Sequence, residues 1–197
     1  MTSREPFDPL KSLRRVSATH EADISNVNLR ALSAFQRALL VTDGTVTKFI
    51  EITTMEPMDV VLLEQAQHVL EDDHPWLQAG RQTVVTVRQV IIEGRYSRTL
   101  YVHAASCLVP GRLPGEVQTR LELRGEGIGR LLNDLHIETR REILWYGREH
   151  LTDLPATIRD RTDGEFVSRT YRIFAGGAPI ALIHEKFPIL VGLPSMD

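Results

Sequence analysis

Apolar residues recur at helical spacing near the amino end of the chain. The apolar positions are Leu29, Leu32, Phe35, Leu39 and Leu40. Intervals of three and four residues place side chains on one face of a helix. Ser25 or Asn28 can cap its start, and Asp43-Gly44 supplies a turn at its end. The pattern therefore predicts a helix over residues 28–40.

Most of the following chain alternates polar and apolar residues and is rich in β-branched side chains, which is typical of strands. The run over 58–70 fits either a helix or a strand, and we favour a strand. Gly94 marks the turn of a hairpin over 82–104, and Gly176-Gly177 the turn of a second hairpin. The strands expected are 45–54, 58–70, two runs within 82–104, 139–149, 166–175 and 180–187.

Two further features complete the predicted elements. Apolar residues after the glycines of "GEGIGRLLNDL" indicate a short helix within 125–135. Along 139–149, alternation places Arg141, Ile143 and Trp145 on one face of a strand. Several antiparallel strands with few, segregated helices predict an α+β fold in a single domain. The two hairpins share an order of arginine, strand, glycine turn, strand and histidine, which reflects either a duplication or the likeness of any two hairpins.

Composition limits the class of protein. A chain of 197 residues with 42% hydrophobic and 25% charged residues fits one soluble domain. Residues 1–24 read as a flexible leader, and 25–197 as the domain. The net charge of −3 gives no basic field for nucleic acid. Cys107 cannot form an internal disulfide, and neither a membrane span nor a signal peptide is evident, so we expect a cytoplasmic protein.

The stretch "APIALIHEKFPI" places charges inside an apolar strand. Alternation puts Glu185 on the face of Ile183, and His184 and Lys186 on the other face. If Ile183 is buried, Glu185 must be paired, hydrogen-bonded or neutral. One interpretation is an edge strand whose charges deter aggregation. The other is a pocket acid that transfers protons.

Arg88 raises the same question, because it lies between "VVTV" and "QVII". It either reaches solvent from an exposed sheet face or clamps a carboxylate with its planar guanidinium. The "GEGIGR" stretch has neither dinucleotide-binding nor P-loop spacing, but free amides at a helix start can receive an anion. Histidines are scattered, so we expect no metal.

The order of a strand with Arg88, then "GIGRLL", "REILWYG" and "SRTYRIFAGGAPIALIHEKFP", resembles the chorismate pyruvate-lyase family and its actinobacterial relatives that form 4-hydroxybenzoate. The likeness covers roughly residues 28–190 and is most specific from Ser168 to Pro188. It implies a mainly antiparallel sheet with helices packed against it and an internal pocket closed by flaps.

The resemblance also implies site residues. The family's carboxylate-gripping arginine matches Arg88 in "VRQVII", and its last-strand carboxylate matches Glu185 in "HEKFP". The leucine-glycine whose main chain meets the ligand matches Ile128-Gly129, and a pocket-wall methionine matches Val46. The change to valine reshapes the wall. The strand "HAASCLVP" lacks an arginine found in the enterobacterial branch.

The implied activity is elimination of pyruvate from chorismate to give 4-hydroxybenzoate, with Arg88 as carboxylate clamp and Glu185 as proton shuttle. The implied reaction requires neither a metal nor a redox cofactor, so we expect no cofactor. The expected partner is a small aromatic acid, with no nucleic acid and no membrane. The alternative is a non-catalytic domain of the same fold that binds an aromatic acid, as in the ligand-sensing domains of some bacterial regulators. Those regulators carry a DNA-binding module, for which the leader is too short.

Overall fold

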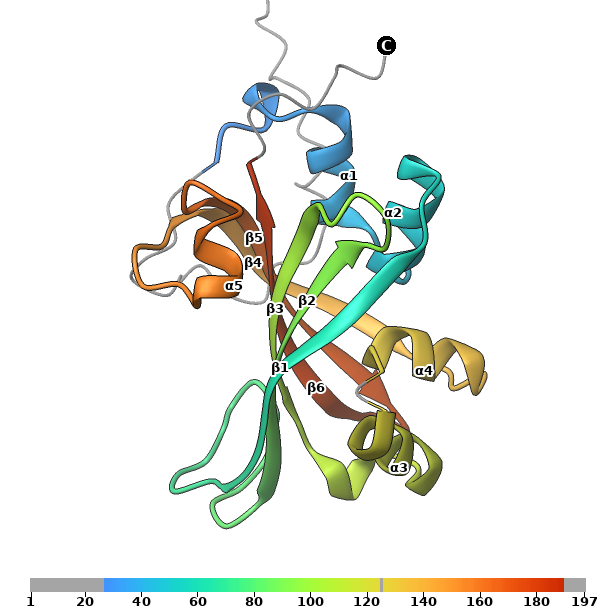
Figure 1. Cartoon of the computed structure of the whole chain (residues 1–197). Helices are drawn as coiled ribbons and strands as arrows, with labels where there is room; N and C mark the ends of the chain where they lie inside the picture. The colour runs from blue at the N-terminus through green and yellow to red at the C-terminus, as the bar shows by residue number, and fades with distance from the viewer. Residues whose placement is uncertain (1–26, 125, 190–197) are drawn as a thin grey trace, which may run out of the picture.

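Six strands form one antiparallel sheet in the computed structural model, which describes residues 27–124 and 126–189 (Figure 1). The predicted leader 1–24 lies outside these residues. The strands are β1 Met58–Val69, β2 Val84–Gly94, β3 Leu100–Leu108, β4 Arg140–His150, β5 Glu165–Ala175 and β6 Ala178–Pro188. Their order is β1-β2-β3-β6-β5-β4, so two three-stranded units meet at the β3–β6 pair. The predicted α+β class, both hairpins and the strand at 58–70 are confirmed.

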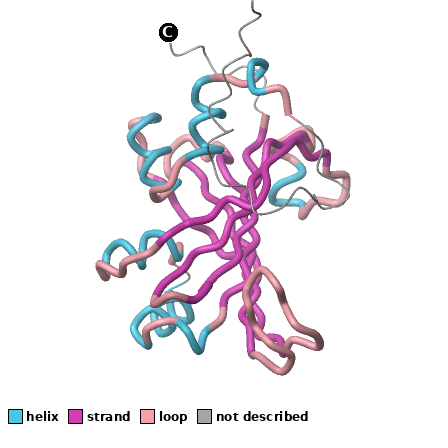
Figure 2. The backbone as a smooth tube through the Cα atoms, turned by 180° about the vertical axis from the view of Figure 1, so that it is seen from behind, coloured by secondary structure: helices cyan, strands magenta, loops and turns pink. Residues whose placement is uncertain are grey.

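The two faces of the sheet are covered differently. The helices are α1 Ala34–Val41, α2 Val46–Thr54, α3 Gly115–Arg124, α4 Ile128–Asp134 and α5 Ala156–Arg159. Apolar residues of α1 to α4 pack on the face that bears Ile183 and Phe187, here called the site face. Helix α5 and the β1–β2 connection 70–83 pack on the opposite face. The views from both sides show these two groups of segments apart from each other (Figures 1 and 2).

The segment 45–54, predicted as a strand, is helix α2. Its apolar residues Val46, Phe49 and Ile50 stand at intervals of three and four, and Val46 and Ile50 are buried against the sheet. Burial of this helical face outweighs the strand preference of its β-branched residues. That prediction was wrong because the β-branched content was given more weight than the spacing.

The predicted helix at 28–40 is divided. A single 3-10 turn covers Leu29–Ala31, and α1 begins after Ser33. The Ser33 hydroxyl accepts from the Gln36 amide while the Gln36 side chain accepts from the Ser33 amide. This reciprocal capping box fixes the helix start. The helix predicted within 125–135 is confirmed as α4, whereas the connections at 115–124 and 156–159 contain helices that the sequence did not indicate.

The strict alternation expected along β4 is interrupted. A bulge lies between Ile143 and Trp145 in the pairing with β5. One inserted residue moves every later side chain to the other face. Arg141 and Ile143 therefore stay on the site face, while Trp145 packs with Trp76 and Leu182 on the opposite face. The expectation that Trp145 shares a face with Arg141 was wrong.

No described helix is long and apolar enough to cross a bilayer.

Candidate functional site

All five residues named as site candidates line one cavity of about 70 Å³ on the site face. Arg88 comes from β2 and Glu185 from β6, so the sheet forms the floor. Val46 is the first residue of α2, and Ile128 and Gly129 begin α4. Two helix starts thus lie over two strands. Residues as far apart in sequence as Val46 and Glu185 meet here because the sheet order brings β2 and β6 to either side of β3.

Arg88 lies in the sheet interior and is 2% exposed. Its two terminal nitrogens both donate to the Glu126 carbonyl at 3.2 Å, and Nε has no partner. Within residues 27–124 and 126–189, no carboxylate forms an ion pair with it. Burial lowers the pKa of Arg88, yet a guanidinium remains charged in proteins. An anion in the cavity would supply the missing charge. The surface interpretation of Arg88 was wrong.

Glu185 has two partners on β5, and the register of the last hairpin explains why. Arg169 is its direct neighbour across the β5–β6 pair. Arg169 Nε donates to Glu185 Oε2 at 2.8 Å, and the Tyr171 hydroxyl donates to Oε1 at 3.0 Å. Glu185 is 6% exposed and β6 lies between β3 and β5. The edge-strand interpretation was therefore wrong, and the expected facing of Glu185 with Ile183 is confirmed.

The pair Arg169–Glu185 is held by further contacts. Arg169 is 1% exposed, donates from Nη1 to the Thr42 carbonyl, and lies over the rings of Tyr171 and Phe187. Burial opposes its charge, but Glu185 and then Tyr171 raise the pKa of Arg169 above its ordinary value. Burial and the Glu185 charge also raise the pKa of Tyr171, so its hydroxyl keeps the proton that it donates. Glu185 is thus oriented from two sides.

A second cavity of about 200 Å³ adjoins the first. Arg141 and Tyr171 line both cavities, and Arg169 lines the second. Arg141 donates from Nη1 to the Asp43 carbonyl at 2.6 Å. Two other nitrogens, Nε of Arg141 and Nη2 of Arg169, have no partner in the described part of the chain. Two guanidinium groups with unused donors therefore border the space beyond Glu185.

Sequence reasoning missed Arg141, Arg169 and Tyr171 as site residues. The signal for two of them was present in the predicted final hairpin, since its turn pairs Arg169 with Glu185 and alternation then places Tyr171 beside them. Arg141 carried no such signal, because β4 follows no short turn from the other strands of the site.

Helix α4 offers main chain to the first cavity. It begins after Gly127 with no side-chain cap, so its first amides are unsatisfied within the helix. A Cβ on Gly129 would lie 3.8 Å from Thr45 Cγ2 and 3.9 Å from Arg141 Nη2. A methyl group would therefore fit without collision but would occupy cavity space.

No cluster of three or more histidine, cysteine, aspartate or glutamate residues suited to a metal ion occurs in the described residues.

The fold is shared with solved structures of bacterial regulators. PhnF from Mycobacterium smegmatis aligns with a TM-score of 0.59 at 8% identity, covering 76% of this chain and 65% of that one. Its effector domain aligns with a TM-score of 0.56, covering 74% of this chain and 89% of that one. A GntR-family regulator from Bacillus cereus gives 0.52 over 71% and 98%. Identities this low show the fold alone.

Sequence comparison is more specific. A chorismate pyruvate-lyase of Mycobacterium tuberculosis (strain H37Rv) is 31% identical over 179 residues, which is 85% of this chain and 86% of the relative. A chorismate pyruvate-lyase of Mycobacterium leprae is 29% identical over 170 residues, 83% of this chain and 79% of the relative. The family described as chorismate pyruvate-lyase Rv2949c-like matches residues 40–192, which include every residue of the cavity described above. The chain belongs to the Rv2949c-like chorismate pyruvate-lyase family.

Proposed function

We propose that this protein eliminates pyruvate from chorismate to form 4-hydroxybenzoate. The observation that carries the proposal is Arg88, a buried cation that faces a cavity without a carboxylate partner in the described residues. A buried charge is costly unless it is paired, and a carboxylate ligand would pair it in a bidentate fashion. The names of the curated relatives identify the acid they act on as chorismate.

Chorismate carries two carboxylates, so a second cation is needed. Arg141 and Arg169 supply it at the junction of the two cavities, where each has a buried nitrogen with no partner in the part of the chain that the structure describes. We assign the ring carboxylate to Arg88 and the side-chain carboxylate to the Arg141–Arg169 side. The arginine missing from "HAASCLVP" on β3 is then replaced by arginines of β4 and β5.

Glu185 is assigned as the proton shuttle. In the elimination, the ring carbon–oxygen bond to the enolpyruvyl group breaks, and a proton leaves the neighbouring ring carbon that bears the hydroxyl group. A proton joins the methylene carbon of the departing enolpyruvate, which completes pyruvate and leaves an aromatic ring. Each Glu185 oxygen accepts one hydrogen bond in the fold, so each keeps a lone pair for this transfer.

The substrate needs more room than the first cavity offers. Its volume of about 70 Å³ is well below the roughly 300 Å³ at the lower end of small-molecule pockets. The combined volume of the first cavity and the adjoining cavity approaches that value, and Arg141 lines both. We infer that the Arg141 side chain leaves the Asp43 carbonyl when substrate enters and binds the substrate instead.

The test is incubation of the purified protein with chorismate, with pyruvate followed by a coupled dehydrogenase assay and the aromatic product by chromatography. We expect one pyruvate and one 4-hydroxybenzoate for each chorismate consumed, at a rate that a chelator leaves unchanged. Chorismate that binds to the protein but persists at high protein concentration would favour the alternative, a ligand-binding domain. The structural similarity to the PhnF effector domain is the observation that supports this alternative.

A further inference from the structure

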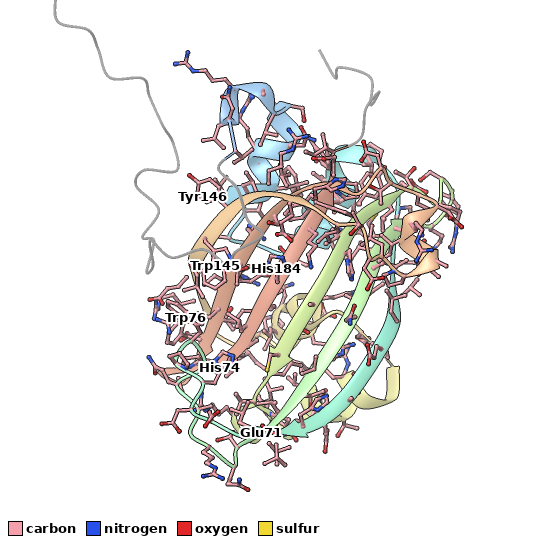
Figure 3. All side chains as sticks on the ribbon, turned by 90° about the vertical axis from the view of Figure 1, so that its left-hand side faces the viewer. Glu71, His74, Trp76, Trp145, Tyr146 and His184 are labelled. Atoms are coloured by element: carbon pink, nitrogen blue, oxygen red, sulfur yellow. The ribbon has the colours of Figure 1, made fainter. Side chains whose placement is uncertain are left out.

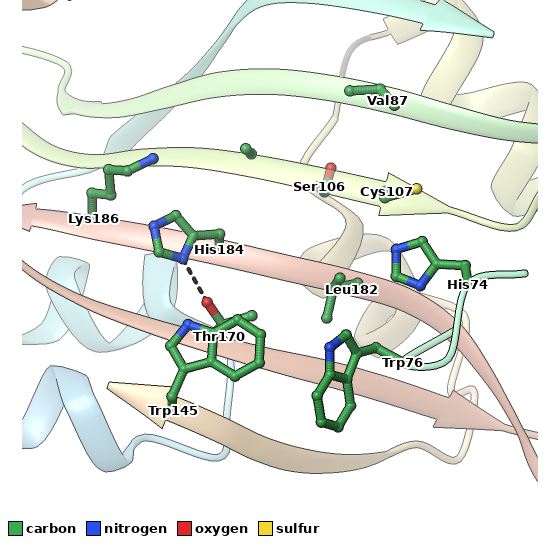
Figure 4. A pocket seen from close by; sticks show the side chains of 11 residues that line it. His74, Trp76, Val87, Ser106, Cys107, Trp145, Thr170, Leu182, His184 and Lys186 are labelled. Carbon is green, nitrogen blue, oxygen red and sulfur yellow. Dashed lines mark hydrogen bonds between the residues drawn. The ribbon is translucent and has the colours of Figure 1, made fainter. Parts of the chain in front are cut away.

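The opposite face of the sheet carries a larger cavity that the proposed reaction does not use. Its volume is about 580 Å³, within the roughly 300–1,000 Å³ range of small-molecule sites. The floor is made by Val87, Cys107 and Leu182, neighbours in one row across β2, β3 and β6. His184 and Lys186 extend the floor along β6. Figure 3 looks toward this face, and Figure 4 shows the cavity.

Two tryptophans form the aromatic side of the cavity. Trp145 of β4 faces this cavity because of the bulge, and Trp76 comes from the connection 70–83. Their rings meet edge to face with centroids 5.7 Å apart. They are the two tryptophans of the whole chain. Aromatic walls over an apolar floor suit a planar aromatic group.

The connection that carries Trp76 is pinned to the rest of the fold. Arg172 Nη1 donates to the Trp76 carbonyl at 3.1 Å. Arg112 donates to the carbonyls of Leu77 and Gln78 at 2.6 and 2.7 Å. Three hydrogen bonds from charged donors hold this wall in place, so the cavity is formed before any ligand binds.

One end of the cavity carries an amine and an unused donor. Lys186 lines this end beside His184. Trp145 is 5% exposed, and its Nε1 has no hydrogen-bond partner among the described residues. In Figure 4 this nitrogen lies on the side of the indole toward Thr170 and His184. A buried N–H without a partner is costly, and an acceptor on a ligand would satisfy it. Among the described residues no carboxylate lines the cavity itself, and that of Glu149 bonds the lining His184.

The histidine at this end is fixed by its neighbours. His184 Nδ1 is 2.6 Å from Thr170 Oγ1, and Nε2 is 2.9 Å from Glu149 Oε1. This hydroxyl–imidazole–carboxylate order resembles an activated nucleophile. However, Thr170 is 2% exposed and lies on β5, which pairs with strands on both sides. Its backbone amides are therefore engaged in the sheet and cannot stabilise an oxyanion. The network orients the ring and favours binding over catalysis.

We propose that this cavity is a second ligand site, which binds an aromatic anion larger than a single ring. The aromatic part would lie between the two tryptophans and the apolar floor, and the carboxylate or sulfonate would contact Lys186 and Trp145 Nε1. The site lies on the other side of the sheet from Arg88 and Glu185, as alternation along β6 requires. The proposal therefore does not depend on the activity proposed above.

The test uses 1-anilinonaphthalene-8-sulfonate, an aromatic anion, and N-phenyl-1-naphthylamine, its neutral counterpart. Because both tryptophans line the cavity, quenching of tryptophan emission reports on this site. We expect saturable quenching with one equivalent of the anion, and binding of the neutral compound at least about tenfold weaker. Equal affinities would contradict a site for anions, and absence of quenching would overturn the site.

Variants separate the contributions of charge and donor. Lys186→Met and Trp145→Phe should each lower the affinity for the anion about tenfold or more. Lys186→Met should leave chorismate turnover unchanged. Trp145→Phe keeps an aromatic wall, and Trp76 remains as the reporter. Arg88→Met, on the other face, is the matched control and should leave quenching unchanged. Loss of quenching in Arg88→Met, or competition by chorismate, would show that the anion binds in the site-face cavity instead.

Discussion

Two buried arginines of the site face differ in their partners. Arg169 is neutralised by Glu185 and held by the Thr42 carbonyl. Arg88 is as deeply buried, but among residues 27–124 and 126–189 its donors reach only the Glu126 carbonyl. In a buried ion pair each charge is neutralised by its partner, whereas a buried cation without a carboxylate partner can still be neutralised by a negatively charged ligand. This contrast supports the proposed role of Arg88 as a carboxylate clamp, and it adds the positioning of Glu185 to the proposed role of Arg169.

Replacing Arg88 should separate binding from stability. Arg88→Met removes the charge and keeps most of the volume, so substrate affinity should fall by at least about 100-fold. Arg88→Lys should recover little, because an ammonium lacks the planar fork. The free energy of unfolding should change by less than about 1 kcal/mol, since an unpaired buried charge is removed. Calorimetric titration and urea unfolding measure the two quantities.

The control for Arg88 is Arg95→Met, which removes an exposed arginine paired with Asp59. It should leave affinity unchanged. Normal affinity in Arg88→Met would end the carboxylate-clamp assignment.

Glu185→Gln tests the proton shuttle. Gln keeps the size and one acceptor oxygen but cannot carry the proton, so turnover should fall by roughly 10²- to 10⁴-fold. The change also leaves Arg169 without its counter-charge, which should lower the free energy of unfolding by about 3 kcal/mol. Single-turnover rates and urea unfolding are the measurements.

The double variant Arg169→Met/Glu185→Gln distinguishes the two roles of Glu185. Removing the Arg169 charge, which has no carboxylate partner once Glu185 is replaced, should restore part of the stability but none of the turnover. If turnover returned with stability, Glu185 would act only by holding Arg169.

At the scale of elements, residues of all six strands and the starts of α2 and α4 line the first cavity, and α4 brings main chain to it at Gly129. Its glycine leaves the approach to the cavity open, since a Cβ there would meet Thr45 and Arg141 at ordinary contact distances. The same position in an isolated helix would favour alanine.

Gly129→Ala tests whether the α4 main chain meets the ligand. The helix should gain about 0.5 kcal/mol of stability, while the added methyl group should raise the Kd for the product by about tenfold. Gly115→Ala in α3 is the matched control, because nothing lies within 4 Å of its added Cβ, and it should leave product affinity unchanged. Unchanged affinity in Gly129→Ala would show that the ligand does not approach this part of α4.

The whole molecule is expected to lose stability in mild acid through a buried histidine. His103 on β3 bonds Gln89 from Nε2 at 3.3 Å. Burial, and then the charges of Lys186 and His184, lower its pKa from 6.5 to about 4. The neutral form is therefore favoured in the fold. The contribution of neutral His103 to stability is complete above pH 6.5, where this histidine is neutral in the unfolded chain as well. The contribution is lost as the pH falls from 6.5 toward 4.

The expected size of this loss is roughly 2 to 3 kcal/mol, since one pKa unit corresponds to about 1.4 kcal/mol. Urea unfolding between pH 7 and pH 4 measures it. In His103→Gln the slope between about pH 6.5 and pH 4 should become shallower, whereas the exposed control His68→Gln should keep the slope of the parent protein. An identical slope in His103→Gln would assign the acid sensitivity to carboxylates instead.

Local patterns along the chain were sufficient for the strands, both hairpins and helix α4, because alternation and turn residues act over a few positions. Alternation along "IALIHEKF" also determined that Glu185 faces inward and His184 outward, and the structure confirms both. The five residues named from the resemblance all line the first cavity, whereas Arg141 and Tyr171, which also line it, were not named. These features depend on neighbours in sequence or on motifs that stay continuous along the chain.

Only the tertiary structure decided the rest. Whether β6 is an edge or an interior strand depends on pairing with β3, some 80 residues earlier. The bulge that turns Trp145 to the opposite face arises from register between strands, which periodicity within one strand does not encode. Helix α2 forms because the sheet buries Val46 and Ile50 against it. The contrast between paired Arg169 and unpaired Arg88 likewise exists only after the strands are assembled.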